Sequence, residues 1–191
     1  MKAQLALGFI YYKGERFKRD VNKAIHYLKL AAKQNDPKAQ SALGSIYYEG
    51  DHVEKDINKA INYYLQAAEL NDLNAQLTLA LIYNNGYHVE RDIRKAIHYY
   101  KLAAEQNNPI AHFNLGKILY GKDSEYKNID ESIHYIQLAA DQNYAEAQYF
   151  LGNFDLGNSF CERNTKKAIG YLKKAADQNH SQAQCDLGLI Y

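Results

Sequence analysis

The stretch AQSALGSIYYEGDHVEKDINKAINYYLQAAELNDLN, residues 39–74, decides the fold, because the rest of the chain repeats it. Its first alanine recurs every 36 residues without slippage, at Ala3, Ala39, Ala75, Ala111, Ala147 and Ala183. A fixed period of roughly 20 to 50 residues is typical of a stacked repeat array. The sequence therefore predicts one repeat domain over 1–191, made of units 1–36, 37–72, 73–108, 109–144 and 145–180 and a partial unit at 181–191.

The first half of each unit has the pattern of a helix. Ala39, Leu43 and Ile46 are spaced four and three residues apart, which places them on one stripe of a helix over 37–49. Gly44 leaves room on that helix for close approach of a neighbour, and Gly50 supplies the positive φ that a helix end requires.

The second half of each unit predicts another helix, which runs antiparallel to the first. Asp56 is placed to cap its N-terminus, and equivalent positions hold Asp20, Asp92, Asn128 and Asn164. Glu131, three residues after Asn128, predicts a capping box in the fourth unit. An asparagine suited to the left-handed conformation ends each second helix, at Asn35, Asn71, Asn107, Asn143 and Asn179. The chain is thus predicted to be a string of αα-hairpins.

The succession Leu43-Gly44, Tyr47, Gly50, Asp56, Lys59-Ala60, Tyr63-Tyr64, Ala67-Ala68 and Ala75-Gln76 resembles the Sel-one-like repeat (SLR) family, a relative of the tetratricopeptide repeat. The resemblance covers the whole chain, with asparagine in place of the family's usual glycine at Asn35 and its equivalents. It implies an all-α, right-handed superhelical solenoid of stacked antiparallel αα-hairpins. It also implies a binding adaptor, as in ubiquitin-ligase complexes of the endoplasmic reticulum, fungal cell-wall signalling and bacterial proteins that engage host cells.

Composition argues against several classes of function. The chain has 23 basic and 22 acidic side chains, interspersed, so no basic footprint predicts nucleic-acid binding. Cys161 and Cys185 make no disulfide framework and no zinc spacing. Cys161 takes a slot that holds Val53 and Val89, so we expect it to be a small buried hydrophobic residue, with a bridge to Cys185 as the alternative. We expect no metal and no cofactor. No apolar run approaches the ~18 residues of a membrane helix, so we expect no direct membrane insertion.

The two ends of the sequence carry little information about location. Residues 3–12 follow the repeat pattern, so we interpret them as structure and not as a signal peptide. The sequence starts at one helix start and stops inside another, as expected of an excised piece of a longer array or of an array without caps. The compartment is left open, and so is the oligomeric state, with a monomer expected.

Positions that vary between units are free to bind a partner. On the first helices these slots are often apolar or aromatic, although they lie away from the core stripe. Two interpretations stay open: packing between the first helices of neighbouring units, or a groove for a partner's peptide or helix. The predicted partner-binding residues, with Phe113 and Tyr149 foremost, are Leu77, Leu81, Phe113, Lys117, Tyr120, Tyr149, Asn153 and Asp155.

Units four and five depart from the pattern. Asp155 stands where other units have Tyr11, Tyr47 and Tyr83, in a region that is also rich in phenylalanine, and this favours either drift near an array end or a specialised pocket. His112 replaces the glutamine of the other units, and with Lys117 it forms an off-pattern titratable pair.

No residues are predicted to be catalytic. The Ser-x-x-Lys match at 124–127 lies in a predicted loop without companion motifs, and His112 has no recognisable orienting partner. We therefore expect a protein-protein interaction scaffold. The alternatives are a structural spacer within a longer chain and an enzyme or enzyme-regulating module that uses His112 and Lys117.

Overall fold

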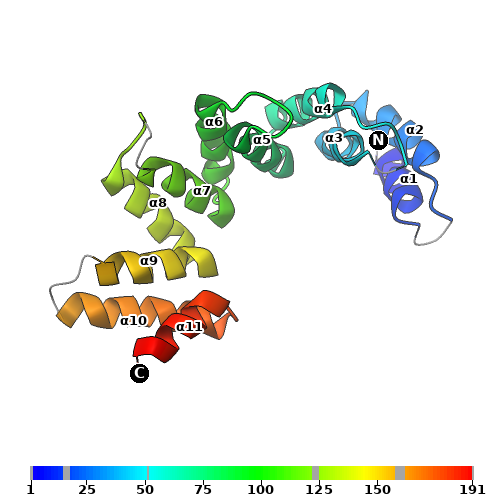
Figure 1. The fold of residues 1–191 in the computed structure, drawn as a ribbon. Coiled ribbons are helices and arrows are strands. Elements are labelled where there is room, and N and C mark those ends of the chain that lie inside the picture. Colours follow the sequence, from blue (N-terminus) through cyan, green and yellow to red (C-terminus); the bar gives the residue numbers. More distant parts are fainter. Residues whose placement is uncertain (1, 15–17, 51, 122–124, 158–161, 191) are drawn as a thin grey trace. The chain divides into compact units, whose positions relative to one another are not determined.

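The computed structural model describes residues 2–14, 18–50, 52–121, 125–157 and 162–190, and every regular element in these ranges is an α-helix (Figure 1). The chain divides into two compact units, Met1–Leu102 and Ala103–Tyr191. The expectation of a single domain stays a prediction, and the two units are described separately below.

The first unit holds α1 (Lys2–Lys13), α2 (Val21–Ala32), α3 (Pro37–Glu49), α4 (Ile57–Glu69), α5 (Leu73–Asn85) and most of α6 (Ile93–Glu105). The second unit holds α7 (Pro109–Tyr120), α8 (Ile129–Asp141), α9 (Ala145–Gly157), α10 (Glu162–Asp177) and α11 (Ser181–Ile190). From α1 to α5 and from α7 to α11, each helix packs against the next one in the chain, which confirms the predicted solenoid of αα-hairpins.

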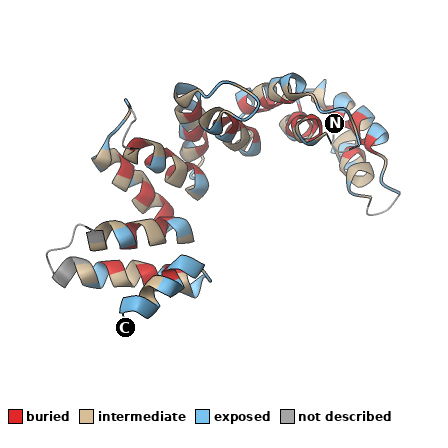
Figure 2. Ribbon diagram, viewed as in Figure 1, coloured by how far each residue is buried: buried red, intermediate tan, exposed pale blue. Residues whose placement is uncertain are grey.

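The buried stripe of each hairpin is the one that the spacing predicts (Figure 2). In α3, Ala39, Leu43 and Ile46 are buried, and they pack on the alanines and Tyr64 of α4. A Cβ added to Gly44 would lie 2.8 Å from ring atoms of Tyr64, so the glycine is required for the close approach of the two helices.

Predicted caps are present at four of the five second helices. The side-chain oxygens of Asp20, Asp56, Asp92 and Asn128 each accept a hydrogen bond from the backbone N–H three residues on, at 3.0, 2.9, 3.0 and 3.2 Å. The prediction for Asn164 is wrong: α10 begins earlier, at Glu162, so Asn164 lies inside its first turn. The first helix of that repeat, α9, ends at Gly157, the position equivalent to the end of α3 at Glu49, so only the start of the second helix has moved.

The predicted capping box of α8 is only half formed. Glu131 Oε2 accepts from the Asn128 side-chain amide at 3.2 Å, whereas the Asn128 backbone N–H donates to the Leu119 carbonyl at 3.0 Å. The preceding helix has therefore taken the donor that a complete box would use.

The turns between repeats use the conformation that the asparagines predict. Asn35, Asn71, Asn107, Asn143 and Asn179 have φ between 57° and 65°. Gly50 and Gly86 end their helices with φ of 72° and 71°, whereas Gly121, one place earlier in its repeat, has φ of −51°. The first helix of the fourth repeat thus ends differently from its counterparts in the first unit.

No helix in the described ranges is both long and apolar enough to cross a membrane. Cys185 lies exposed on α11 with a free thiol. Cys161, its possible bridge partner, lies outside the described residues.

Candidate functional site

A groove of about 420 Å³ opens between α7 and α9, the first helices of repeats four and five. Its lining residues are Phe113, Lys117 and Tyr120 from α7 and Glu146, Tyr149, Phe150, Asn153 and Phe154 from α9. Both helices belong to the second unit, so the groove lies within one compact body.

Helical periodicity explains why one face of α7 lines the groove. Phe113, Lys117 and Tyr120 are spaced four and three residues apart and therefore share a face. The same helix buries Ala111, Leu115 and Leu119 on the stripe that packs against α8. The scaffold thus fixes α7 through one stripe and leaves a second, aromatic stripe available.

The aromatic rings of the groove also pack against one another across the two helices. Phe113 lies edge-on to Phe150, with ring centroids 6.4 Å apart, and Tyr120 lies edge-on to Phe150 and Phe154 at 5.1 and 6.1 Å. These side chains are partly buried. The sequence left two alternatives open for these residues, packing between first helices and lining of a groove. In the structure the same residues do both.

Few charges border this aromatic surface. Of the described lining residues, Lys117 is the only cation and Glu146 the only anion. The Lys117 Nζ lies 5.6 Å from the centroid of the Phe113 ring, while Glu146 lies exposed in the first turn of α9. The groove is thus an apolar floor with one positive charge beside its centre and one negative charge at an end.

Tyr149 connects the groove to the last described helices. Its ring stacks on His180 with centroids 4.4 Å apart. Burial raises the pKa of the Tyr149 hydroxyl, and so does the neighbouring carboxylate of Asp186. The raised pKa favours the neutral phenol, whose hydroxyl interacts with Asp186 on α11.

Five of the eight residues that the sequence predicts to bind a partner line this groove: Phe113, Lys117, Tyr120, Tyr149 and Asn153. Leu77 and Leu81 are on α5 in the first unit and do not line it, although Leu81 is 51% exposed. Partner binding by all of these residues stays a prediction.

The predicted partner-binding residues do not include three lining residues, Glu146, Phe150 and Phe154, although the sequence marks the phenylalanine-rich region of the fifth repeat as a possible pocket. Phe154 occupies the slot that holds the buried Ile46 in the second repeat, so periodicity assigns it to the core. The larger ring in an isoleucine slot was the available signal. Phe150 likewise takes a slot that holds Ala42 in the second repeat.

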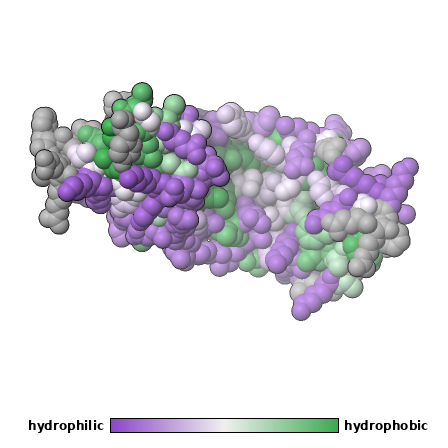
Figure 3. Space-filling model, turned by 90° about the horizontal axis from the view of Figure 1, so that it is seen from below, coloured by the Kyte–Doolittle hydropathy of each residue, from purple (hydrophilic) through white to green (hydrophobic). Residues whose placement is uncertain are grey.

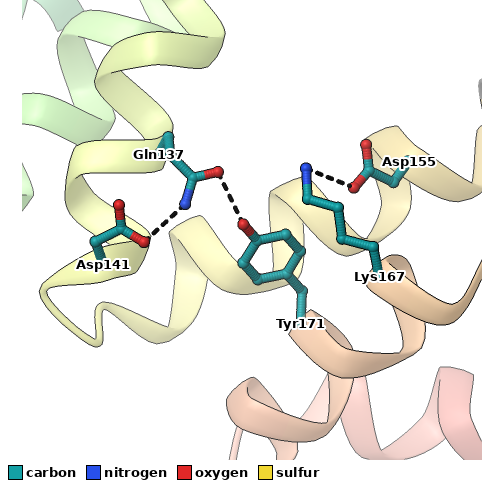
Figure 4. Close-up of polar contacts among 5 residues, drawn as sticks. All are labelled: Gln137, Asp141, Asp155, Lys167 and Tyr171. Atoms are coloured by element: carbon teal, nitrogen blue, oxygen red, sulfur yellow. Dashed lines mark hydrogen bonds and ion pairs between the residues drawn. The ribbon is translucent and has the colours of Figure 1, made fainter. Parts of the chain in front are cut away.

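Asp155 is not part of the groove and has a partner of its own (Figure 4). Its Oδ2 lies 3.6 Å from Nζ of Lys167 on α10. The Tyr171 hydroxyl, on the same helix, donates to Oε1 of Gln137 at 2.8 Å, and the Gln137 amide donates to Asp141 at 2.8 Å. These contacts tie α8, α9 and α10 together by polar side chains.

His112 has the surroundings of a structural residue. It is 4% exposed, and its Nδ1 lies 3.2 Å from the amide nitrogen of Gln142. Burial lowers the pKa of its imidazole, so the neutral form is favoured. At the equivalent position Gln76 donates to the Ala68 carbonyl at 3.4 Å, so this slot ties neighbouring helices together. His112 does not line the groove with Lys117, and Ser124 of the Ser-x-x-Lys match lies outside the described residues.

A second, more polar hollow of about 810 Å³ lies in the first unit, against the N-terminus of α4. Two of its lysines have polar partners: Lys59 Nζ lies 3.3 Å from Asp56, and Lys55 Nζ lies 3.3 Å from the His88 ring. The third, Lys29, has its Nζ 6.0 Å from the centroid of the Tyr47 ring. Hydrophilic side chains also cover much of the face seen in Figure 3, with hydrophobic ones gathered in separate patches. Of the two hollows, the groove around Phe113 is the more aromatic one.

Comparison with known proteins identifies the repeat. The family model described as Sel1 repeat matches residues 2–36, 37–72, 73–108, 109–144 and 145–180. No curated protein matches the sequence. Among solved structures, a Sel1 repeat protein from Oxalobacter formigenes is 31% identical, with a TM-score of 0.84 over 100% of this chain and 78% of that one.

Two further structures are more distant. The Escherichia coli protein c5321, described as a protective antigen displaying an SLR fold, is 27% identical, with a TM-score of 0.55 over 100% of this chain and 49% of that one. Immunity protein Pa5087 from Pseudomonas aeruginosa is 24% identical, with a TM-score of 0.54 over 95% and 67%, and it shows the fold alone. The matched repeats span nearly the whole sequence, and this chain belongs to the Sel1 repeat family.

Proposed function

We propose that this protein is an interaction scaffold, and that the groove between α7 and α9 binds a peptide segment or a helix of a partner protein. Sel1 repeats are commonly protein-interaction scaffolds and are generally non-catalytic. The repeats supply a rigid frame, and the off-pattern side chains of repeats four and five supply the binding surface.

The observation that carries the proposal is the set of aromatic rings in the groove, Phe113, Tyr120, Tyr149, Phe150 and Phe154. Aromatic side chains dominate the energetics of protein interfaces, because each buries a large apolar area with little loss of conformational freedom. Four of these rings, Phe113, Tyr120, Phe150 and Phe154, pack against one another, and Tyr149 stacks on His180, so the rings are held in place before a partner arrives. Such preorganisation lowers the entropic cost of binding.

The test is a selection of random twelve-residue peptides, displayed on phage, against the full chain. Enriched peptides are then synthesised with a fluorophore and titrated by fluorescence polarisation. We expect Phe113→Ala with Tyr149→Ala to weaken their binding at least about tenfold, since loss of an interface anchor costs ~2 kcal/mol or more.

Leu70→Ala is the control, because it truncates an exposed apolar side chain that lies outside the groove and is not among the predicted partner-binding residues. It should leave peptide affinity unchanged. Peptides that bind the double variant as well as the parent chain would contradict the groove. A chain that enriches no peptide would instead support a structural spacer.

A further inference from the structure

We infer that the groove between α7 and α9 selects an acidic partner segment, in which a bulky apolar side chain lies beside a carboxylate that pairs with Lys117. This inference rests on the proposed function and narrows the chemistry of its partner.

Lys117 lies in the middle of the aromatic face of α7. Along α7 it lies between Phe113 and Tyr120, and both rings line the groove. A segment that covers these rings must therefore also cover, or pass beside, the ammonium group. In the other units this slot holds Phe9, Ser45, Leu81, Asn153 and Leu189, so the cation at this position is specific to the fourth repeat.

Covering the ammonium group of Lys117 costs free energy unless the partner supplies a polar contact. Lys117 is exposed, and its Nζ lies over the Phe113 ring at 5.6 Å, with no ion pair recorded among the described residues. A purely apolar segment would remove water from this ammonium group without supplying a hydrogen bond, and this desolvation costs free energy of binding. A carboxylate restores the lost interaction through a charge-assisted hydrogen bond.

Glu146 does not cancel this preference. The α9 residue equivalent to Lys117 is Asn153, and Glu146 precedes it by seven residues, or about 10 Å along the helix at 1.5 Å per residue. Glu146 also lies in the first turn of α9, where a negative charge interacts favourably with the helix dipole and stays in water. The central charge of the groove is therefore positive, and a partner's carboxylate is expected toward the Tyr120 end.

Selections from the same random library against three versions of the full chain test this inference: the parent, Lys117→Gln and Glu146→Gln. We expect peptides enriched by the parent chain to carry aspartate or glutamate next to an aromatic or aliphatic residue. This bias should disappear with Lys117→Gln and persist with Glu146→Gln, which is the matched neutralisation of the opposite charge.

Titration of one enriched peptide and its amide counterpart then measures the pairing. Replacing its carboxylate by the amide should weaken binding to the parent chain about tenfold, the loss expected for a hydrogen bond between charged groups. The same replacement should have no effect on Lys117→Gln, and Lys117→Arg should restore the preference.

The outcomes separate the two proposals. Two outcomes overturn this inference and leave the proposed function intact. In one, the peptides depend on Phe113 but show no acidic bias; in the other, the acidic bias persists with Lys117→Gln. The absence of any peptide that depends on Phe113 overturns both.

Discussion

Nζ of Lys167 lies 3.6 Å from Oδ2 of Asp155. The equivalent lysine of the second repeat, Lys59, lies over a tyrosine ring instead. In that repeat Tyr47 stacks on Tyr63 with centroids 5.9 Å apart, and Lys59 Nζ lies 4.6 Å from the centroid of Tyr47. The fifth repeat keeps the lysine and the second tyrosine but exchanges a stacked ring for an ion pair. Asp155 is thus a substitution inside the scaffold, compensated locally.

Asp155→Tyr should therefore stabilise the chain. The introduced ring can stack on Tyr171 and lie under Lys167, and an aromatic pair contributes about 1 kcal/mol beyond its area. Urea denaturation followed by circular dichroism measures the free energy of unfolding. Asp155→Asn is the control: it removes the ion pair without adding a ring and should cost less than about 1 kcal/mol, because Lys167 is 58% exposed. Equal effects of the two variants would contradict this account.

The same variant tests the predicted role of Asp155 in binding. If Asp155→Tyr leaves the affinity of a groove-binding peptide unchanged, Asp155 is no longer a candidate for partner contact. A marked loss of affinity would extend the binding surface beyond the residues that line the groove.

His112 should make stability fall on mild acidification. Burial holds the pKa of the folded-state imidazole below its ordinary value of 6.5, so below that pH the unfolded chain takes up a proton that the folded chain resists. The contribution is present above pH 6.5 and is lost as the pH falls through the lower, folded-state value. Urea midpoints about one pH unit above and below 6.5 measure the difference.

His112→Gln is the control for this pH dependence, because glutamine occupies the slot in other repeats and Gln148 donates there to the Ala140 carbonyl at 3.2 Å. The variant should fold and should lose part of the acid sensitivity. Identical pH profiles for the two chains would show that the exposed histidines dominate.

Gly116→Ala should destabilise the fourth repeat by roughly 1 to 3 kcal/mol, the usual range for overpacking. Its Cβ would lie 2.5 Å from Ile136 and 2.9 Å from the Ser132 carbonyl oxygen, and backbone cannot move aside cheaply. Thermal unfolding measures the effect. Gly170→Ala makes the matched comparison, since nothing lies within 4 Å of its Cβ position in α10. That substitution should stabilise by about 0.5 to 1 kcal/mol, because glycine is unfavourable inside a helix.

The turn asparagines should differ in their response to glycine. Asn143 and Asn35 both have positive φ, which glycine also adopts. Oδ1 of Asn143 additionally accepts from Gln148 and Gln178 at 3.0 and 3.3 Å, whereas no hydrogen bond is recorded for the Asn35 side chain among the described residues. Asn143→Gly should therefore cost about 1 kcal/mol and Asn35→Gly almost nothing in chemical denaturation. Equal costs would show that φ alone decides these turns.

The sequence predicted the scaffold well, because the features that build it are local and recur. The stripe of Ala39, Leu43 and Ile46, the cap at Asp56 and the left-handed Asn71 each depend on residues within a turn or two. Periodicity failed where one repeat changed its boundaries, as at Asn164, and where a donor had two possible acceptors, as at Asn128.

The groove was only partly predictable, since it depends on contacts between helices that are far apart in sequence. Phe113, Tyr120 and Tyr149 were identified because they vary between repeats. Phe154 lies in the phenylalanine-rich region that the sequence marks, but it was not among the predicted partner-binding residues because its slot is buried in the second and third repeats. Its ring packs against Tyr120 and Phe150 at the groove. Leu77 and Leu81 satisfied the same sequence criterion without joining that groove, so variability alone does not locate a binding surface.

The packing of each helix against its neighbours in the chain has a kinetic consequence. Every hairpin closes only a short loop before it gains contacts, so the entropic barrier to its formation is small and folding can begin in any repeat. Opening should be equally local: one hairpin can lose its amide protection against hydrogen exchange while distant ones keep theirs. The side chains of one repeat can therefore change, as at Lys117 and Asp155, while the other repeats keep their fold.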